Sequence, residues 1–149
     1  MSRSITMSVI VGFLAAAGLT VGSASASQAA ASVSPEAACG SGYSRVSDGT
    51  REIKSGSAVY GRAYLLYNNS TGKNCLAVIK SANTRVSTYV KATLTVQGSG
   101  GKSVSGNAKS YVTVTRLATG KCVMYSGEIH NVGGTKAARG GRSYWGNCG

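Results

Sequence analysis

Short runs of alternating apolar and polar residues dominate the chain from Cys39 onward. Within residues 84–97, the apolar side chains of Ala92, Leu94 and Val96 alternate with polar ones, which is the period of a strand with one buried face. Such runs are rich in β-branched and aromatic residues and are separated by glycine, asparagine and serine. No segment has a convincing helical period. The pattern predicts an all-β fold, a small antiparallel β-sandwich or barrel.

Two predicted hairpins carry similar sequences at their turns. Residues 63–80, AYLLYNNSTGKNCLAVIK, are two apolar runs around a turn whose asparagines and glycine tolerate left-handed backbone angles. Residues 109–117 and 121–127 are predicted to be the strands of a second hairpin. TGKNC and TGKC, at the two turns, are interpreted as one structural corner used twice. Lys73 and Lys121 are then solvated, and the segments are not reactive lysine–cysteine sites.

Two glycine-rich segments are predicted to be irregular. Residues 98–107, GSGGKSVSGN, are the longest run of breaker residues and indicate a loop or the ragged end of a hairpin. Residues 133–149 are predicted to be mostly loop until Tyr144 and Trp145. We expect these two rings to cover one end of the core beside Cys148.

The chain is predicted to consist of an export signal, a leader and one domain. Residues 1–26 have a basic start, an uncharged apolar stretch at 7–21 and a cleavage site of small residues at 24–26. Residues 27–38 are small and polar and predict a flexible leader, and residues 39–149 are predicted to be a single all-β domain. No later stretch approaches the about 18–20 apolar residues that cross a bilayer, so we expect no transmembrane segment.

All four cysteines follow the predicted cleavage site, and an even number in an exported chain indicates two disulfides. Three pairings are possible. We favour Cys39 with Cys75 and Cys122 with Cys148, because each bridge then closes over local hairpins. Single, scattered cysteines and one histidine do not match the paired ligands of zinc sites, so we expect no metal and no cofactor.

The charge balance predicts anionic partners. Losing the signal lowers the basic count from 16 to 15, which against four acids leaves a net charge of +11. Such a field attracts anionic cell-wall or spore-surface polymers without selecting among them, and we expect no specific nucleic-acid binding. Tyrosines are interleaved with the basic residues at positions 60, 64, 67, 89, 111 and 125. Their rings could form a face that stacks on sugars or bases, or they could be half-buried strand residues. The candidate contacts with anionic polymers are Arg45, Arg62, Lys80, Arg85, Lys91, Lys109 and Arg116.

The sequence has no recognisable catalytic constellation. Residues 98–103, GSGGKS, resemble the end of a phosphate-binding loop, but Val96 stands where its first glycine belongs and no helix follows. His130 is the only histidine, and no serine lies in a nucleophile elbow. Asp48 and Glu52 are more typical of a solvated turn than of an acid–base pair. We predict that the protein is not an enzyme. The open alternative is a secreted hydrolase using His130, or a hydrolase inhibitor, directed at polysaccharide or protein.

Four segments occur in a characteristic order, namely AACGSGY, YLLYNNSTGKNCLAVI, GKCVMYSG and a terminal CG that follows a tryptophan. Together they resemble the spore-associated protein A family, small exported proteins of filamentous, spore-forming bacteria. The resemblance covers about residues 37–149. It implies an extracellular protein at the spore or cell surface, and it supplies no catalytic residues. We therefore expect a secreted, non-enzymatic, basic protein retained there by electrostatic contacts, with its oligomeric state left open.

Overall fold

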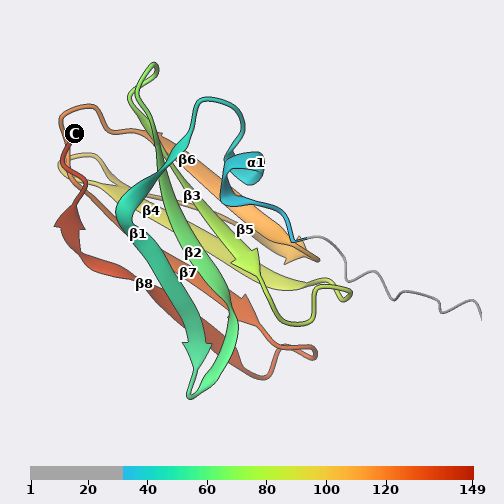
Figure 1. Ribbon diagram of the computed structural model, residues 1–149. Coiled ribbons are helices and arrows are strands. Elements are labelled where there is room, and N and C mark those ends of the chain that lie inside the picture. The colour runs from blue at the N-terminus through green and yellow to red at the C-terminus, as the bar shows by residue number, and fades with distance from the viewer. Residues whose placement is uncertain (1–31) are drawn as a thin grey trace, which may run out of the picture.

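The computed structural model describes residues 32–149, so the predicted signal peptide, residues 1–26, lies outside the described part of the chain. One short helix precedes eight strands, all paired antiparallel (Figure 1). Their bounds are α1 Pro35–Cys39, β1 Ser44–Ser55, β2 Ala58–Asn68, β3 Lys73–Lys80, β4 Thr88–Val96, β5 Gly100–Ala108, β6 Tyr111–Leu117, β7 Val123–His130 and β8 Ala137–Gly146. The predicted all-β class is confirmed.

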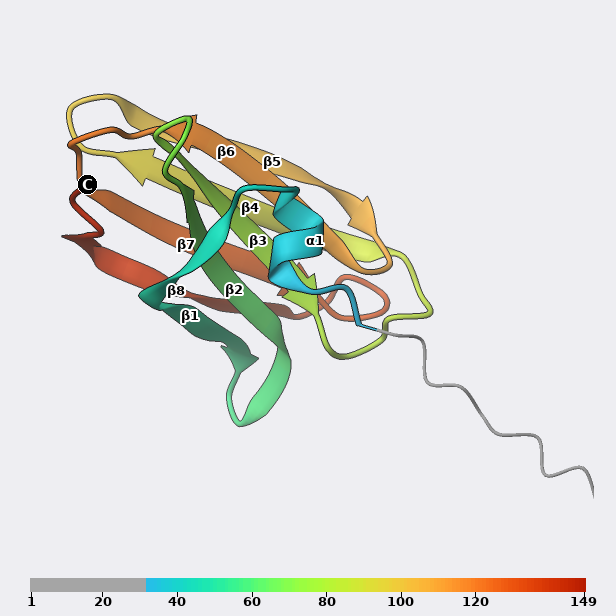
Figure 2. The ribbon, with the colours of Figure 1, turned by 45° about the horizontal axis from the view of Figure 1, so that its top comes forward.

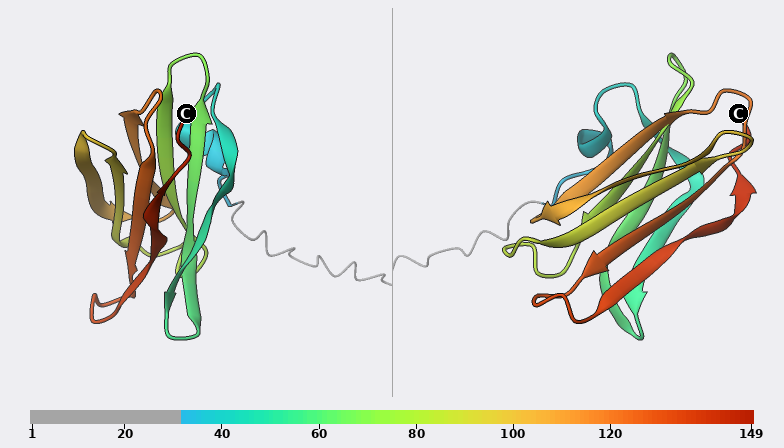
Figure 3. Two further views of the ribbon diagram at one scale, coloured as in Figure 1. Left: turned by 90° about the vertical axis from the view of Figure 1, so that its left-hand side faces the viewer. Right: turned by 180° about the vertical axis from the view of Figure 1, so that it is seen from behind.

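The strands form one sheet that folds over into a flattened, nearly closed barrel. Its order is β5-β4-β7-β8-β1-β2-β3-β6, and Figure 3 shows the two resulting layers edge-on. At the β8–β1 seam, the layers are joined by a single paired position, Lys54 with Arg139. The edge strands β5 and β6 share no ladder in the described chain. The guanidinium of Arg116 spans this gap and donates to the carbonyl oxygens of Ser99 and Gly100, at 3.0 and 3.2 Å.

The second predicted hairpin does not form. β6 pairs with β3, whereas β7 pairs with β4 and β8 in the other layer. Residues 118–122 therefore cross between the layers, and the interpretation of TGKC as a hairpin corner is wrong. The two TGK segments meet instead, because the carbonyl oxygen of Gly72 accepts from the backbone N–H of Ala118 at 3.0 Å and from the hydroxyl of Thr119 at 3.5 Å.

Both glycine-rich segments that were predicted to be irregular contain strands, β5 and β8, so those predictions are wrong. Backbone pairing needs no side chain, and some positions require that none is present. A Cβ at Gly140 would overlap the carbonyl oxygen of Glu52 across the β8–β1 seam. Between the layers, a Cβ at Gly127 would lie 2.6 Å from Cδ1 of Ile53 and 2.8 Å from Cγ2 of Val78. The absence of a side chain at Gly127 and Gly140 therefore allows the two layers, and strands β1 and β8, to lie close together.

The main core lies between the two layers and uses alternate strand positions, including Ala92, Leu94 and Val96, as the alternation predicts. A second, smaller cluster occupies the outer face of β2 and β3, where α1 covers it (Figure 2). This cluster consists of Leu66, Cys75, Ala77 and Ile79, packed under Val33, Ala38, Cys39, Tyr43 and Tyr64. Strand β3 is therefore buried on both faces, which explains its nearly unbroken apolar sequence.

Helix α1 begins inside the segment that was predicted to be a flexible leader. The Ser34 hydroxyl caps it by accepting a hydrogen bond from the backbone N–H of Ala37 at 3.1 Å, and Pro35 follows the cap. A disulfide between Cys39 and Cys75 fastens the helix to β3. The folded part thus starts before Cys39. The second disulfide joins Cys122, in the crossover, to Cys148, after β8.

We expect Gly140→Ala to lower the free energy of unfolding by about 2–3 kcal/mol, because the added methyl group must displace main chain at the β8–β1 seam. Urea denaturation with both disulfides intact measures this change. Gly106→Ala, in β5, is the matched control, because a Cβ there has no other atom within 4 Å. It should change the same free energy by no more than about 0.5–1 kcal/mol. Equal losses in the two variants would contradict the role assigned to Gly140.

Candidate anion-binding pocket

The seven predicted cationic contacts do not form one continuous patch. Three of them, Arg62, Lys80 and Arg85, line one pocket of about 450 Å³. Lys91 lies on the other layer, where it is paired in register with Glu128 of β7.

The other three predicted contacts are Arg45, Lys109 and Arg116. The side chain of Arg45 is bonded to Glu36 through Nε at 2.6 Å. Arg116 donates to backbone carbonyls at the β5–β6 gap. Lys109 is exposed in the turn between β5 and β6, next to the pocket residue Ser110.

The pocket lies on the outer face of the β2–β3 pair, where β2 begins and β3 ends. Arg62 and Tyr64 come from β2 and Ile79 from β3, and the β3–β4 connection and the β5–β6 turn complete the wall. These two connections contribute Ser81, Thr84, Arg85 and Ser110. Among residues 32–149, no acidic side chain lines the pocket.

Lys80 lines the pocket but is only 3% exposed. Its ammonium donates to the carbonyl oxygens of Val86 at 2.8 Å and Ala108 at 3.2 Å. Burial lowers the pKa of Lys80, because removing the ammonium from water disfavours its charged form. The expectation that Lys80 contacts a surface polymer directly is therefore wrong.

Arg62 and Arg85 are the exposed cations of the pocket. Nη2 of Arg62 lies 3.3 Å from Oε1 of Glu52, whose other oxygen is 3.0 Å from Nζ of Lys54. One carboxylate is thus shared by two cations, and the hydrogen bond from Lys54 is the main reason that the pKa of Glu52 is lowered. Arg85 forms no ion pair with any acid in the described chain. The pocket therefore keeps a net positive charge.

Sequence reasoning did not find the pocket hydroxyls of Ser81, Thr84 and Ser110. Serine and threonine between strands are typical of turns, and nothing in the local pattern separates these three from the others. Ser110 comes close to the other two because the β3–β6 ladder continues to the backbone N–H of Lys80, which donates to the carbonyl oxygen of Ser110 at 2.8 Å.

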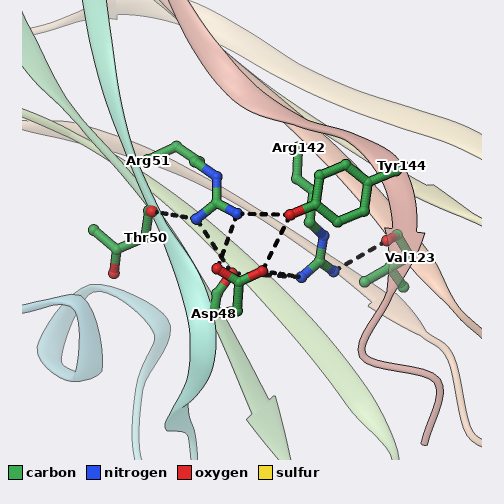
Figure 4. Close-up of polar contacts among 6 residues, drawn as sticks. All are labelled: Asp48, Thr50, Arg51, Val123, Arg142 and Tyr144. Carbon is green, nitrogen blue, oxygen red and sulfur yellow. Dashed lines mark hydrogen bonds and ion pairs between the residues drawn. The ribbon is translucent and has the colours of Figure 1, made fainter.

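A second polar cluster joins β1 to β8 (Figure 4). Arg142 is 3% exposed, and its guanidinium donates to the carbonyl oxygens of Val123 at 3.2 Å and Asp48 at 3.4 Å. The same group lies 5.2 and 5.8 Å from the ring centroids of Tyr125 and Tyr144. Arg142 thus ties the start of β1 and the start of β7 to the end of β8.

Tyr144 lies on the exposed side of this cluster, where its hydroxyl contacts Arg51 and Asp48. The Tyr144 hydroxyl accepts from Nη2 of Arg51 at 3.1 Å and donates to Oδ2 of Asp48 at 3.3 Å. Tyr144 is 57% exposed and Trp145 is 41% exposed, so the expectation that they cover the end of the core is wrong. Asp48 is bonded to Arg51 at 2.9 Å, which is the main cause of its lowered pKa.

The residues considered for hydrolysis are engaged with other side chains. Nε2 of His130 lies 2.7 Å from Oε1 of Glu128, whose Oε2 accepts from Nε of Arg139 at 2.9 Å. The His130 ring packs on Tyr89 with the centroids 4.8 Å apart. Within residues 32–149, no serine or cysteine side chain hydrogen-bonds to His130. The alternative of a hydrolase that works through His130 therefore gains no geometric support.

Within the described residues, no three His, Cys, Asp or Glu side chains gather as a metal site would require. None of the helices in that part of the chain has the length and apolar character needed to cross a membrane.

Comparison with known proteins gives one clear similarity. Over 116 residues the chain is 34% identical to spore-associated protein A of Streptomyces coelicolor, and the alignment covers 76% of this chain and 71% of that protein. No protein-family model matches the chain. No solved structure matches it either.

The Glu128 cluster predicts a pH dependence of stability. The hydrogen bond from His130, followed by that from Arg139, lowers the pKa of Glu128 below its ordinary value of 4.5. A carboxylate with a lowered folded-state pKa contributes stability above the unfolded value, and this contribution is lost as the pH falls through the folded value. We expect Glu128→Gln to be less stable than the wild type at pH 7, by about 1 kcal/mol or less because the cluster is partly exposed. The difference should shrink below pH 4.5. Urea denaturation of both proteins from pH 7 to about 3 tests this, and a pH-independent difference would contradict it.

Proposed function

The chain belongs to the spore-associated protein A family, and from this premise we propose that it is secreted and held at the spore or cell surface by electrostatic contacts with anionic polymers. The observation that carries the proposal is the pocket of Arg62 and Arg85, which contains no acidic side chain from residues 32–149. The name of the Streptomyces coelicolor relative supports the surface location. The apolar stretch at residues 7–21 supports export.

The distribution of ion pairs supports the electrostatic part of the proposal. All four acids are already paired with basic side chains, as Glu36 with Arg45, Asp48 with Arg51, Glu52 with Lys54 and Arg62, and Glu128 with Arg139. The other basic residues have no acidic partner within the described residues, Arg142 apart, which lies 3.9 Å from Asp48. They are Lys73, Lys80, Arg85, Lys91, Lys102, Lys109, Arg116, Lys121 and Lys136. Apart from the buried Lys80, these charges are therefore available to attract polyanions.

We propose further that the protein acts by binding and not by catalysis. His130 is bonded to Glu128, which also binds Arg139. Asp48 and Glu52 are bonded to different basic neighbours, Arg51 and Lys54. Both carboxyl groups have a lowered pKa, which favours the charged form over the protonated form that a general acid needs.

Retention on isolated spores or cell walls should fall steeply as sodium chloride is raised, because exposed charges are screened beyond about 3 Å at 1 M salt. The measurement is the bound fraction of purified protein in a salt series at constant pH. Retention that is unchanged at about 1 M salt would contradict electrostatic binding.

The position of the contact is tested with two variants of equal net charge. We expect Arg62→Gln/Arg85→Gln to lower the affinity for isolated surfaces at least about tenfold, which corresponds to one charge-assisted contact of about 1.4 kcal/mol. The matched control is Lys73→Gln/Lys102→Gln, which removes two exposed charges outside the pocket. It should lower the affinity by no more than about threefold, since it weakens only the general field. Equal losses would show that net charge, and not the pocket, holds the protein.

A further inference from the structure

The pocket offers more hydrogen-bond donors than a carboxylate can use. Two guanidinium groups, Arg62 and Arg85, line the same space as the hydroxyls of Ser81, Thr84 and Ser110. Each guanidinium presents a planar fork of N–H donors, which matches a pair of anionic oxygens. A carboxylate has only two oxygens, whereas a phosphate group has three or four and carries up to two charges. The donor set therefore favours phosphate.

Part of the pocket wall is apolar, and it lies directly beside Arg62, which is paired in register with Ile79. Tyr64 and Ile79 lie on the outer face of β2 and β3, and Val33 precedes α1 beside them. The guanidinium of Arg45 lies 5.5 Å from the Tyr64 ring centroid, which helps to hold the ring in place. The volume of about 450 Å³ is typical of small-molecule sites and larger than a phosphate group alone needs. There is room for an organic group joined to the phosphate.

We propose that this pocket binds a phosphate ester of a sugar or polyol, with the phosphate at Arg62 and Arg85 and the organic part against Tyr64 and Ile79. Two sources share this chemistry, a phosphate-containing surface polymer and a free phosphorylated small molecule. The polymer source rests on the proposed function, and the free source does not.

Isothermal titration calorimetry of the purified, disulfide-bonded protein tests the proposal at fixed ionic strength and pH 7.5. The probes are glycerol 3-phosphate, glucose 6-phosphate, inorganic phosphate, glucuronate and a glycerol phosphate polymer. We expect the two phosphate esters to bind at least about tenfold more tightly than glucuronate, a difference of about 1.4 kcal/mol. Inorganic phosphate, which lacks the organic part, should bind more weakly than the esters. Equal affinity for glucuronate, or the absence of saturable binding by any phosphate probe, overturns the proposal.

Three single substitutions separate direct contact from the general field. Arg85→Gln should weaken glycerol 3-phosphate binding at least about tenfold, and Arg85→Lys should also weaken it because lysine lacks the planar fork. Lys102→Gln, outside the pocket, should change it by less than about twofold. A loss in Arg85→Gln no larger than in Lys102→Gln overturns the proposal. Unchanged thermal unfolding of each variant shows that the fold is intact.

The outcomes distinguish this proposal from the proposed function. Salt-sensitive retention on spores or walls without saturable phosphate-ester binding overturns the phosphate site and leaves electrostatic retention standing. Binding of glycerol 3-phosphate by a protein that surfaces do not retain overturns the proposed function alone. Saturable binding of the polymer supports the surface source, and binding of the small esters without the polymer supports the free one.

Discussion

The close approach of main chain at the β8–β1 seam is the constraint on which the rest of the barrel depends. The seam has one paired position, and Gly140 lies against the carbonyl oxygen of Glu52 where a larger residue would push the strands apart. Because the sheet turns over at this seam, its two edges, β5 and β6, are brought next to each other on the other side. The pocket lies on the layer beyond this seam, where the β3–β6 ladder, with Ile79 opposite Tyr111, places Ser110 beside the end of β3.

Basic side chains span the β5–β6 gap where no strand ladder does. Arg116 donates to carbonyl oxygens at the start of β5, and Lys80 donates to the carbonyl oxygen of Ala108 at its end. Both side chains donate to main-chain carbonyl oxygens at this gap. Part of the large positive charge therefore has a structural use. The net charge of the chain therefore overstates the charge at the surface. Lys80 shows this directly, because its ammonium is buried and bonds to the carbonyl oxygens of Val86 and Ala108.

The sequence carried enough information to predict the fold class and the first hairpin. Residues 84–97 alternate because only their inward positions fill the core, and residues 63–80 form two apolar runs around a turn because β3 is buried on both faces. It fails in β5 and β8, where glycine and serine replace apolar residues and the strands are defined by backbone pairing with β4 and β7. The pocket was not predictable either. Its parts come from β2, β3, the β3–β4 connection and the β5–β6 turn, and the long-range β3–β6 pairing that brings the turn to the end of β3 has no local sequence signal.

Arg142 has a structural role, whereas Arg62 and Arg85 are suited to binding. Burial and charge balance make the difference. Arg142 is buried, donates to main-chain carbonyls of two other strands, and has the Asp48 carboxylate 3.9 Å from its Nη1. Its donors and its charge are mostly used within the molecule, so an external anion would find little to bind. Arg62 and Arg85 are exposed and share a pocket that lacks a lining acid within residues 32–149. Arg85 has no acidic partner in that part of the chain, and Arg62 shares Glu52 with Lys54, so Lys54 can keep the carboxylate paired when an arriving anion takes donors of Arg62.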